Sequence, residues 1–464
     1  MKVKALRSLV ALLLSLVLVL GGTAAAFAED EEPGTTSTTA SESVPSEEAT
    51  SEPDEEATEG TSPTEEETTS TTTSTTSTTA TTEPESETTT TTKPAPKPDF
   101  APDYTGIAKT TYNGEKAWWR VVNGKVQPKA HGVFQNENGW WYVENGKVDF
   151  SHTGVEKNDN GWWRIKDGYV DFNATGIYQN KHGWWRVEKG KVNFKATGLY
   201  KNEHGWWRVE RGCVNFNANG IYQNQNGSWY VKKGCVDFTK SGTVTFGKTT
   251  YTIQKGKVKG ATMKVPLVNQ CPNYPTGCEA ASATMLLKYY GYDISLKQMV
   301  NTIPRENLRT VNGKRYGPRI TEKFVGDPRS GYTSANPGYG AFAPVVTKSL
   351  NNVITNQHGK HKAVNKTGAS FSDLLTFLDQ GKPVIVWSTY NMKTPTTVNA
   401  WYIATSTGPE YFSYPRGTHV CVLRGYDAKN IYLADPYGAK NKTFSRSAFN
   451  DKYKLLGRQA IVLQ

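Results

Sequence analysis

Three residue types that can act together in acyl-transfer chemistry occur in the C-terminal part of the chain. Cys278, His419 and Asp435 supply a thiol, an imidazole and a carboxylate in that order. These are the minimal parts of a cysteine nucleophile with a general base and a group that orients the base. The side-chain amide of Gln270, shortly before the thiol, could donate a hydrogen bond to the oxyanion of a tetrahedral intermediate. If these four groups converge, we expect a hydrolase that acts on acyl groups, with peptide bonds as its substrates.

Each candidate also has an ordinary structural explanation. Cys278 could be an inert buried thiol, and His419 could be a strand histidine whose hydrogen bonds are satisfied. Asp435 precedes Pro436 and could simply start a turn, and Asp427 is an alternative orienting carboxylate. No histidine or cysteine cluster has the spacing of metal ligands, so we expect no metal and no cofactor.

Helical patterns surround the cysteine. A helix is predicted over 279–290, beginning at Cys278 and closed by Gly291. A thiol at a helix N-terminus is stabilised as a thiolate by the helix dipole and the free N–H groups. A second helix is expected after Ser295, and a third over 374–378. The first helix therefore gives Cys278 a reason to ionise.

Strand patterns surround the other two candidates. The residues 383–387 form an apolar strand, and 420–424 with 431–434 predict a hairpin. His419 stands at the start of one hairpin strand and Asp435 just past the other. We therefore expect both side chains at one edge of a sheet, with the cysteine helix packed on that sheet.

Four segments carry a resemblance to a known family. Residues 270–291 read QCPNYPTGCEAASATMLLKYYG, and 324–328, 418–427 and 435–438 follow in the family's order. They resemble cysteine peptidases similar to the bacteriocin-processing, double-glycine peptidases of the papain superfamily. The resemblance covers nearly the whole of residues 261–464 and implies an α+β, papain-like domain there.

The resemblance also implies roles for the four candidates. Cys278 would be the nucleophile, His419 the base and Asp435 the orienting carboxylate. Gln270 and the backbone N–H of Cys278 would form the oxyanion hole. The transporter domain that accompanies many such peptidases is missing, which leaves the cleaved bond open.

Residues 99–260 repeat with a period of 22. The turn glycines are Gly124, Gly146, Gly168, Gly190, Gly212, Gly234 and Gly256. A Trp-Trp pair precedes most of these turns, but the sixth copy reads Ser228-Trp229 and the seventh has only Tyr251. One such unit cannot bury its own apolar face, so the copies must stack into an array.

Each copy predicts a short β-hairpin. In one copy, 140–143 and 148–150 flank the turn dipeptide Asn145-Gly146. The units resemble the glycine-and-tryptophan repeats of Gram-positive cell-wall-binding proteins, of which choline-binding repeats are the best known. They differ in length and lack a Gly-Trp-Tyr-Tyr core.

Two features of the repeats leave alternatives open. The tryptophans could form the core of the array, or one ring of each pair could stack on a sugar or a cationic headgroup. Cys213 and Cys235 occupy equivalent positions in adjacent copies. They could form a disulfide between copies, although equivalent positions could also lie too far apart for a bridge. Cys271 and Cys421 could be bridged or simply packed.

The N-terminal residues indicate export. Residues 1–28 have a basic start, an apolar run and an A-x-A cleavage site, which is typical of a secretory signal peptide. Residues 29–98 are almost entirely Thr, Ser, Glu and Pro, and predict a disordered linker. No other segment is long and apolar enough for a transmembrane helix, so we expect none in the mature chain.

The charge distribution predicts an anionic partner. Residues 29–98 hold 18 acidic residues and two basic ones, so the rest of the chain is much more basic than the net charge of +11 indicates. A basic exported module fits an anionic cell-wall polymer or a glycan, and no nucleic-acid-binding motif accompanies the charge.

Together these features predict a multidomain protein: a signal peptide (1–28), a linker (29–98), seven β-hairpin repeats (99–260) and a papain-like peptidase domain (261–464). We expect a secreted cysteine peptidase associated with the cell wall of a Gram-positive bacterium, acting on peptides or proteins. Two alternatives are a hydrolase of peptidoglycan stem or cross-bridge peptides and a non-catalytic wall-adhesion protein.

Overall fold

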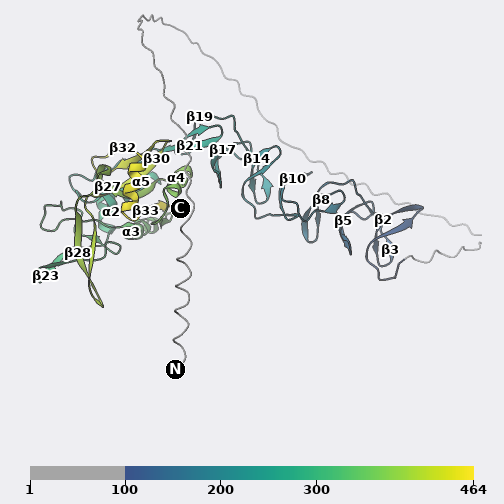
Figure 1. Cartoon of the computed structure of the whole chain (residues 1–464), viewed down its shortest axis with the longest axis horizontal. Coiled ribbons are helices and arrows are strands. Elements are labelled where there is room, and N and C mark those ends of the chain that lie inside the picture. The colour runs from purple at the N-terminus through teal and green to yellow at the C-terminus, as the bar shows by residue number, and fades with distance from the viewer. Residues whose placement is uncertain (1–99) are drawn as a thin grey trace, which may run out of the picture. The chain divides into compact units, whose positions relative to one another are not determined.

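The computed structural model describes residues 100–464, where a β-hairpin array is followed by a domain of helices and sheets (Figure 1). The predicted signal peptide (1–28) and linker (29–98) lie outside the described residues. Within the described range, no helix has the length and apolarity needed to cross a bilayer.

The array is built from short antiparallel strands. A typical copy contributes a strand of five residues, one of six and one of two. The strands are β1 (Gly106–Tyr112), β2 (Glu115–Val122), β3 (Lys125–Val126), β4 (Gly132–Asn136), β5 (Gly139–Glu144), β6 (Lys147–Val148), β7 (Gly154–Asn158), β8 (Gly161–Lys166), β9 (Tyr169–Val170), β10 (Gly176–Asn180), β11 (Gly183–Glu188), β12 (Lys191–Val192), β13 (Gly198–Asn202), β14 (Gly205–Glu210), β15 (Cys213–Val214), β16 (Gly220–Asn224), β17 (Gly227–Lys232), β18 (Cys235–Val236), β19 (Gly242–Phe246), β20 (Thr249–Gln254) and β21 (Lys257–Met263).

The predicted turns are present, but the strand after each turn is short. Asn145 and Gly146 have φ values of 48° and 76°, the positive pair that a type I′ turn requires. Beyond this turn only Lys147–Val148 pairs with β5, and the longer partner of β5 is the preceding strand β4. The expected strand over 148–150 ends early because the Asp149 carboxylate accepts hydrogen bonds from the backbone N–H and hydroxyl of Ser151, which makes a turn.

Neighbouring copies share small hydrophobic cores. In one of them, Val155 of one copy packs with Ala174, Val187 and Val192 of the next. Partly buried tryptophans cover these clusters, and the same arrangement recurs along the array. The prediction that stacked copies bury the apolar face that a single hairpin would leave exposed is therefore confirmed.

The C-terminal domain has five α-helices and one short 3₁₀ helix. They are α1 (Cys278–Tyr289), α2 (Leu296–Thr302), α3 (Ala343–Asn356), α4 (Phe371–Asp379), η1 (Tyr390–Met392) and α5 (Arg446–Leu455). The predicted helices correspond to α1, α2 and α4. Ser295 and Ser370 cap α2 and α4 with their hydroxyl groups.

A central antiparallel sheet carries the candidate residues. In order across the sheet, its strands are β26 (Ala363–Asn365), β33 (Ala460–Leu463), β27 (Val384–Thr389), β30 (Thr418–Tyr426), β31 (Asn430–Asp435) and β32 (Lys440–Ser445). Every residue of β27 is buried, because α1 and α5 both pack against it. The predicted hairpin is β30 with β31.

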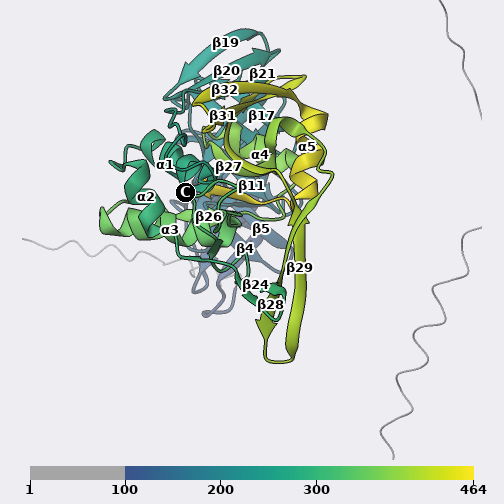
Figure 2. The ribbon, with the colours of Figure 1, turned by 90° about the vertical axis from the view of Figure 1, so that its left-hand side faces the viewer.

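A second, smaller sheet was not anticipated from the sequence. Its strands are β23 (Arg309–Val311), β24 (Lys314–Tyr316), β28 (Val398–Thr405) and β29 (Gly408–Pro415). The long β28–β29 hairpin extends away from the helices (Figure 2). Its base is held by a small core that includes Trp401 and Tyr414. The remaining pair is parallel, β22 (Arg305–Glu306) with β25 (Phe324–Val325).

The last copies of the array pack on this domain. Tyr251, Ile253 and Met263 belong to the same hydrophobic core as α1 and β30. Strand β21 also pairs with the end of β30, through Ala261 opposite Tyr426. The seventh copy therefore shares the core of the domain that follows it.

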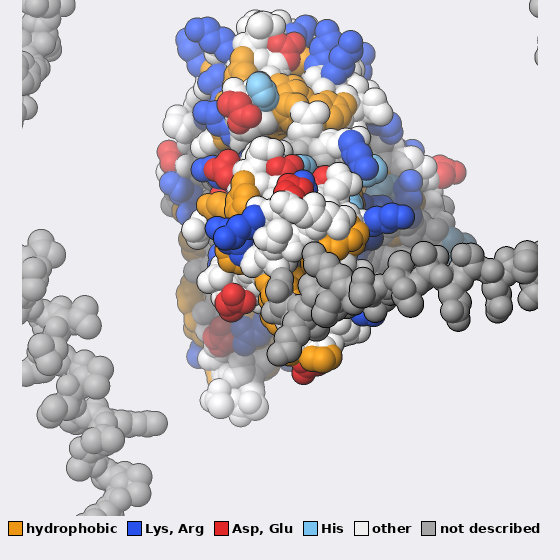
Figure 3. All heavy atoms as spheres, turned by 90° about the vertical axis from the view of Figure 1, so that its right-hand side faces the viewer, with side chains coloured by type: hydrophobic (Ala, Val, Ile, Leu, Met, Phe, Trp, Pro, Cys, Tyr) orange, Lys and Arg blue, Asp and Glu red, His pale blue; other side chains and the backbone are white. Residues whose placement is uncertain are grey.

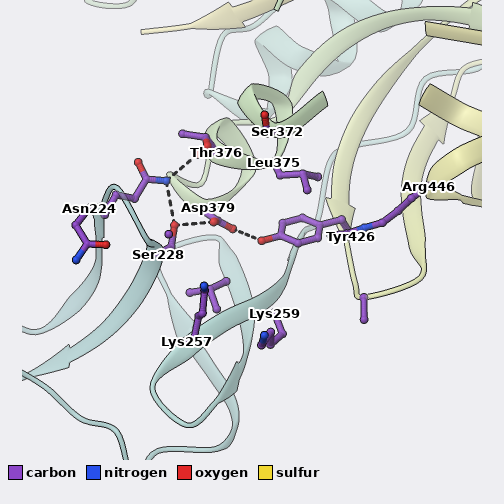
Figure 4. A pocket seen from close by; sticks show the side chains of 14 residues that line it. Asn224, Ser228, Lys257, Lys259, Ser372, Leu375, Thr376, Asp379, Tyr426 and Arg446 are labelled. Atoms are coloured by element: carbon purple, nitrogen blue, oxygen red, sulfur yellow. Dashed lines mark hydrogen bonds between the residues drawn. The ribbon is translucent and has the colours of Figure 1, made fainter. Parts of the chain in front are cut away.

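The serine that replaces a tryptophan in the sixth copy lies in this junction (Figure 4). Ser228 is 3% exposed and donates a hydrogen bond of 2.6 Å to Oδ2 of Asp379, at the end of α4. Tyr426 donates one of 2.6 Å to Oδ1 of the same carboxylate. Because α4 packs against the sixth copy here, a small polar side chain replaces the indole.

Replacing Ser228 with alanine is expected to lower the free energy of unfolding by about 1–3 kcal/mol, because one oxygen of the half-buried Asp379 carboxylate loses its donor. Chemical unfolding would measure this change. Ser151→Ala is the matched control: its hydroxyl bonds within an exposed turn, and its effect should stay within about 0.5 kcal/mol. Equal effects of the two substitutions would contradict the assigned role of Ser228.

Candidate active site

Cys278 is the first residue of helix α1, as predicted. Its side chain is buried, at 8% exposure, and the helix rests on strand β30. A hydrogen bond of 3.0 Å from the Ser282 hydroxyl to the carbonyl of Val420 fixes the helix against that strand. This contact fixes the position of the Cys278 thiol relative to β30.

His419 and Asp435 meet across neighbouring strands, as the hairpin pattern predicted. His419 Nε2 lies 2.6 Å from Asp435 Oδ1, and both side chains are buried. Lys442 Nζ lies 2.7 Å from the other carboxylate oxygen. Burial alone would raise the pKa of Asp435, but its contacts with His419 and Lys442 outweigh burial and lower that pKa. Asp435 is therefore held as a carboxylate beside the imidazole.

The alternative carboxylate, Asp427, lies elsewhere. It accepts hydrogen bonds of 2.7 Å from the backbone N–H groups of Lys429 and Asn430 and so stabilises its own turn. The geometry thus selects Asp435 as the partner of His419.

Three of the four predicted residues line one cavity of about 270 Å³. Cys278, His419 and Gln270 all contribute to its wall, and Asp435 stands behind the imidazole. Much of the remaining wall is aromatic, from Tyr332, Tyr339, Tyr390 and Tyr437. The tyrosines were not predicted to line the site, because they come from three separate segments that only the fold brings together.

The amide of Gln270 is not free to donate in this arrangement. Its Nε2 donates to the carbonyls of Tyr274 and Pro275, at 3.2 and 3.0 Å. Its Oε1 is buried without a hydrogen-bond partner among the described residues. The side chain must rotate before it can donate to an oxyanion. The backbone N–H of Cys278 has no such restriction, because the first turn of a helix has no intrahelical acceptor.

The surroundings of the thiol differ from the sequence expectation. Burial raises the pKa of Cys278 well above its ordinary value, and the Glu279 carboxyl raises it further. The Cys278 thiol donates to Oε2 of Glu279, at 3.4 Å from Sγ. The helix start favours the thiolate, as expected, but burial and this neighbouring acid oppose it. The signal for Glu279 in the sequence was its position: it is the only acid of this helix and directly follows the cysteine.

None of the five cysteines, all of which lie in the described part of the chain, forms a disulfide. Cys213 and Cys235 stand in successive copies, opposite Trp185 and Trp207. The bridge between copies considered from the sequence is therefore not present. Cys421 packs in the core beside the His419–Asp435 pair.

The ligand atoms of His419, Cys421 and Asp435 lie within 4.8 Å of one another. Their types could bind a metal, and sequence spacing did not reveal this grouping. The hydrogen bond between His419 and Asp435 accounts for the proximity of two of the three side chains.

The tryptophans of the array are both packed and partly exposed. Three lysine ammonium groups lie over a tryptophan of the preceding copy: Lys147 over Trp119 at 5.7 Å, Lys191 over Trp163 at 5.1 Å and Lys257 over Trp229 at 5.4 Å. Cys213 and Cys235 take the place of this lysine opposite Trp185 and Trp207. On the face drawn in Figure 3, lysine and arginine side chains are interspersed with hydrophobic ones.

Two parts of the chain match known protein families. Residues 262–461 match the Peptidase_C39 like family. Six segments between residues 103 and 237 match the choline-binding repeat. The uncharacterized protein YvpB of Bacillus subtilis (strain 168) is 31% identical over 214 residues, which is 45% of this chain and 79% of that protein.

Two solved structures are similar to part of the chain. A protein from Bacillus anthracis described as C39-like is 26% identical, with a TM-score of 0.37, over 43% of this chain and 94% of its own. A double-glycine-motif protease from an AMS/PCAT transporter, in complex with a leader peptide, is 18% identical, with a TM-score of 0.23, over 44% of this chain and 91% of its own.

Proposed function

Because this chain belongs to the Peptidase_C39 like family, we propose that it is an exported cysteine peptidase that hydrolyses peptide bonds at the cell surface, where its repeats hold it. One observation carries the proposal. Cys278 and His419 line a single cavity, and His419 is hydrogen-bonded through Nε2 to the buried Asp435. This leaves Nδ1 of His419 as the ring nitrogen that can take a proton from the thiol.

The proposed reaction proceeds in two steps. The Cys278 thiol gives its proton to His419, and the sulfur attacks the peptide carbonyl to form a tetrahedral intermediate. Asp435 keeps the imidazole oriented and stabilises the imidazolium. His419 then protonates the departing amine, leaving a thioester. Water hydrolyses the thioester, with His419 as the base, and frees the thiol.

In this mechanism the oxyanion receives a hydrogen bond from the backbone N–H of Cys278. A rotated Gln270 amide supplies a second donor. The tyrosine-lined cavity favours an extended peptide with apolar or aromatic side chains near the cleaved bond.

The second candidate function is hydrolysis of the stem or cross-bridge peptides of peptidoglycan. The six choline-binding repeat matches favour it, because they indicate a chain retained beside cell-wall material. We infer that the repeats bind an anionic wall polymer or glycan, including polymers that carry cationic headgroups. Trp185 and Trp207, over which no lysine ammonium lies among the described contacts, are the proposed stacking surfaces.

The two substrates can be separated with the purified chain. Cleavage of unrelated peptides in a mass-spectrometric panel, with no release of soluble fragments from purified walls, is expected for a general peptidase. Release of wall fragments with free amino groups would instead assign the second function. A chain pretreated with iodoacetamide is the control for both assays. Inactivity in both, with intact binding to walls, would indicate a non-catalytic adhesion protein.

A further inference from the structure

Glu279 is a buried acid in direct contact with the nucleophile that the mechanism above does not use. It is 2% exposed, and its Oε2 lies 3.4 Å from the sulfur of Cys278. Its other oxygen, Oε1, accepts a hydrogen bond of 2.9 Å from the backbone N–H of Ala341. An acid is rarely buried so completely without a positive partner, so its state of ionisation matters for the thiol beside it.

The carboxyl group has little freedom to move away. A Cβ atom at Gly340 would come within 2.5 Å of Glu279 Oε1, so the backbone there closely approaches the carboxyl. The Ala341 peptide that holds Oε1 is itself fixed, because its carbonyl accepts a hydrogen bond of 2.9 Å from the buried Trp387 indole. Glu279 Oε2 is therefore directed at the sulfur by a rigid arrangement.

Within residues 100–464, no lysine or arginine forms an ion pair with this acid. The titratable groups that face the Cys278–Glu279 pair or share its cavity are Tyr332, Tyr339, Tyr390, Tyr414, Tyr437, His419 and Cys421. Arg416 lies over the ring of Tyr332, 5.7 Å from its centroid, rather than against the carboxyl. His419 is committed to Asp435. An ionised Glu279 is thus stabilised by hydrogen bonds from the backbone N–H groups of Ala341 and of Glu279 itself, and to a smaller extent from the Cys278 thiol.

The two forms of Glu279 have opposite effects on the thiol. Ionised, the carboxylate accepts a hydrogen bond from the thiol and opposes a second negative charge on the sulfur. Neutral, the carboxylic acid can donate its proton in a hydrogen bond to the thiolate, while Oε1 still accepts from Ala341. The proton that the thiol loses goes to His419 in both cases, so Glu279 transfers none.

We propose that neutral Glu279 is a positioning residue that donates a hydrogen bond to the Cys278 thiolate. When Glu279 ionises, this hydrogen bond is lost and Cys278 becomes a poor nucleophile. The proposal rests on the nucleophilic role of Cys278 proposed above. Burial raises the pKa of Glu279 to about 7, so the neutral form prevails below that pH and the ionised form above it. The enzyme would therefore be most reactive in mildly acidic surroundings and lose reactivity above neutral pH.

The test is the rate of iodoacetamide alkylation at Cys278 from about pH 5 to pH 9, with the modified peptide quantified by mass spectrometry. In the wild-type chain the rate constant should fall at least about tenfold as the pH rises through the titration of Glu279. Proton transfer from the thiol to His419 is internal and does not itself depend on pH, and ionised Glu279 shifts that equilibrium toward the neutral thiol by this factor, the equivalent of about one pKa unit. Glu279→Gln keeps a donor and an acceptor of similar shape without a titrating charge. This variant should lack the fall and exceed the wild-type rate above neutral pH by the same factor.

Glu322→Gln, which removes an exposed carboxylate in the same domain, is the matched control and should keep the wild-type profile. A wild-type rate that only rises through neutral pH would overturn the proposal without any variant. A pH profile of alkylation in Glu279→Gln that matches the wild-type profile would also overturn the proposal. A Cys278 that is unreactive at every pH would overturn the proposed peptidase function as well, which distinguishes the two failures.

Discussion

Replacing Cys278 with alanine is expected to lower the rate of peptide hydrolysis by at least about 10⁴-fold, because no other group can form the covalent intermediate. The substitution removes one sulfur from the start of α1 and leaves the sheet and its hydrogen bonds in place. The measurement is kcat on a peptide that the wild-type chain cleaves. Iodoacetamide labelling of the 278–289 segment should disappear with the activity.

The matched control is Cys421→Ala, which removes a second buried thiol on the neighbouring strand. It should retain alkylation at position 278 and most of the hydrolysis rate. If the two variants were equally active, the nucleophile assigned to α1 would be wrong. If both were inactive yet folded, the two thiols would share a role that the present mechanism lacks.

The second large effect is expected at Asp435. Substitution with asparagine keeps the shape but removes the charge that holds His419 in the productive orientation, and kcat should fall by about 10²–10⁴-fold. KM should change little, because Asp435 stands behind the imidazole rather than in the wall of the cavity. Steady-state kinetics on one peptide substrate would separate kcat from KM.

Asp427→Asn is the control, because Asp427 follows β30 along the chain yet bonds only within its turn and to Tyr432. It should leave kcat unchanged and cost some stability. A larger loss of kcat at Asp427 than at Asp435 would reverse the assignment of the orienting carboxylate.

The helices and strands around the candidate residues could be predicted because each is indicated by a short pattern of neighbouring residues. The apolar run after Cys278 indicated α1, Ser295 marked the start of α2, and the pattern over 374–378 indicated α4. The hairpin around Asp427 predicted His419 and Asp435 on adjacent strands and therefore close together, and the structure has them on β30 and β31. The roles of these residues in catalysis stay predictions until the kinetic measurements are made.

What the sequence did not predict depends on contacts between distant segments. The tyrosines of the cavity come from segments far apart in the chain, and no local pattern indicates that they meet. The raised pKa of Cys278 arises from burial under β30 and from the orientation of the Glu279 side chain, neither of which follows from spacing. The orientation of the Gln270 amide likewise depends on carbonyls supplied by the 270–276 turn.

The serine in the sixth copy has a consequence for how such a chain can change over generations. The earlier copies meet one another through nearly identical interfaces, so recombination between their coding repeats could add or remove a unit without creating a new kind of contact. The sixth copy cannot be exchanged in this way, because an indole at position 228 would collide with the end of α4. We therefore expect related chains to vary in repeat number before this point, while the last two units are inherited together with the catalytic domain.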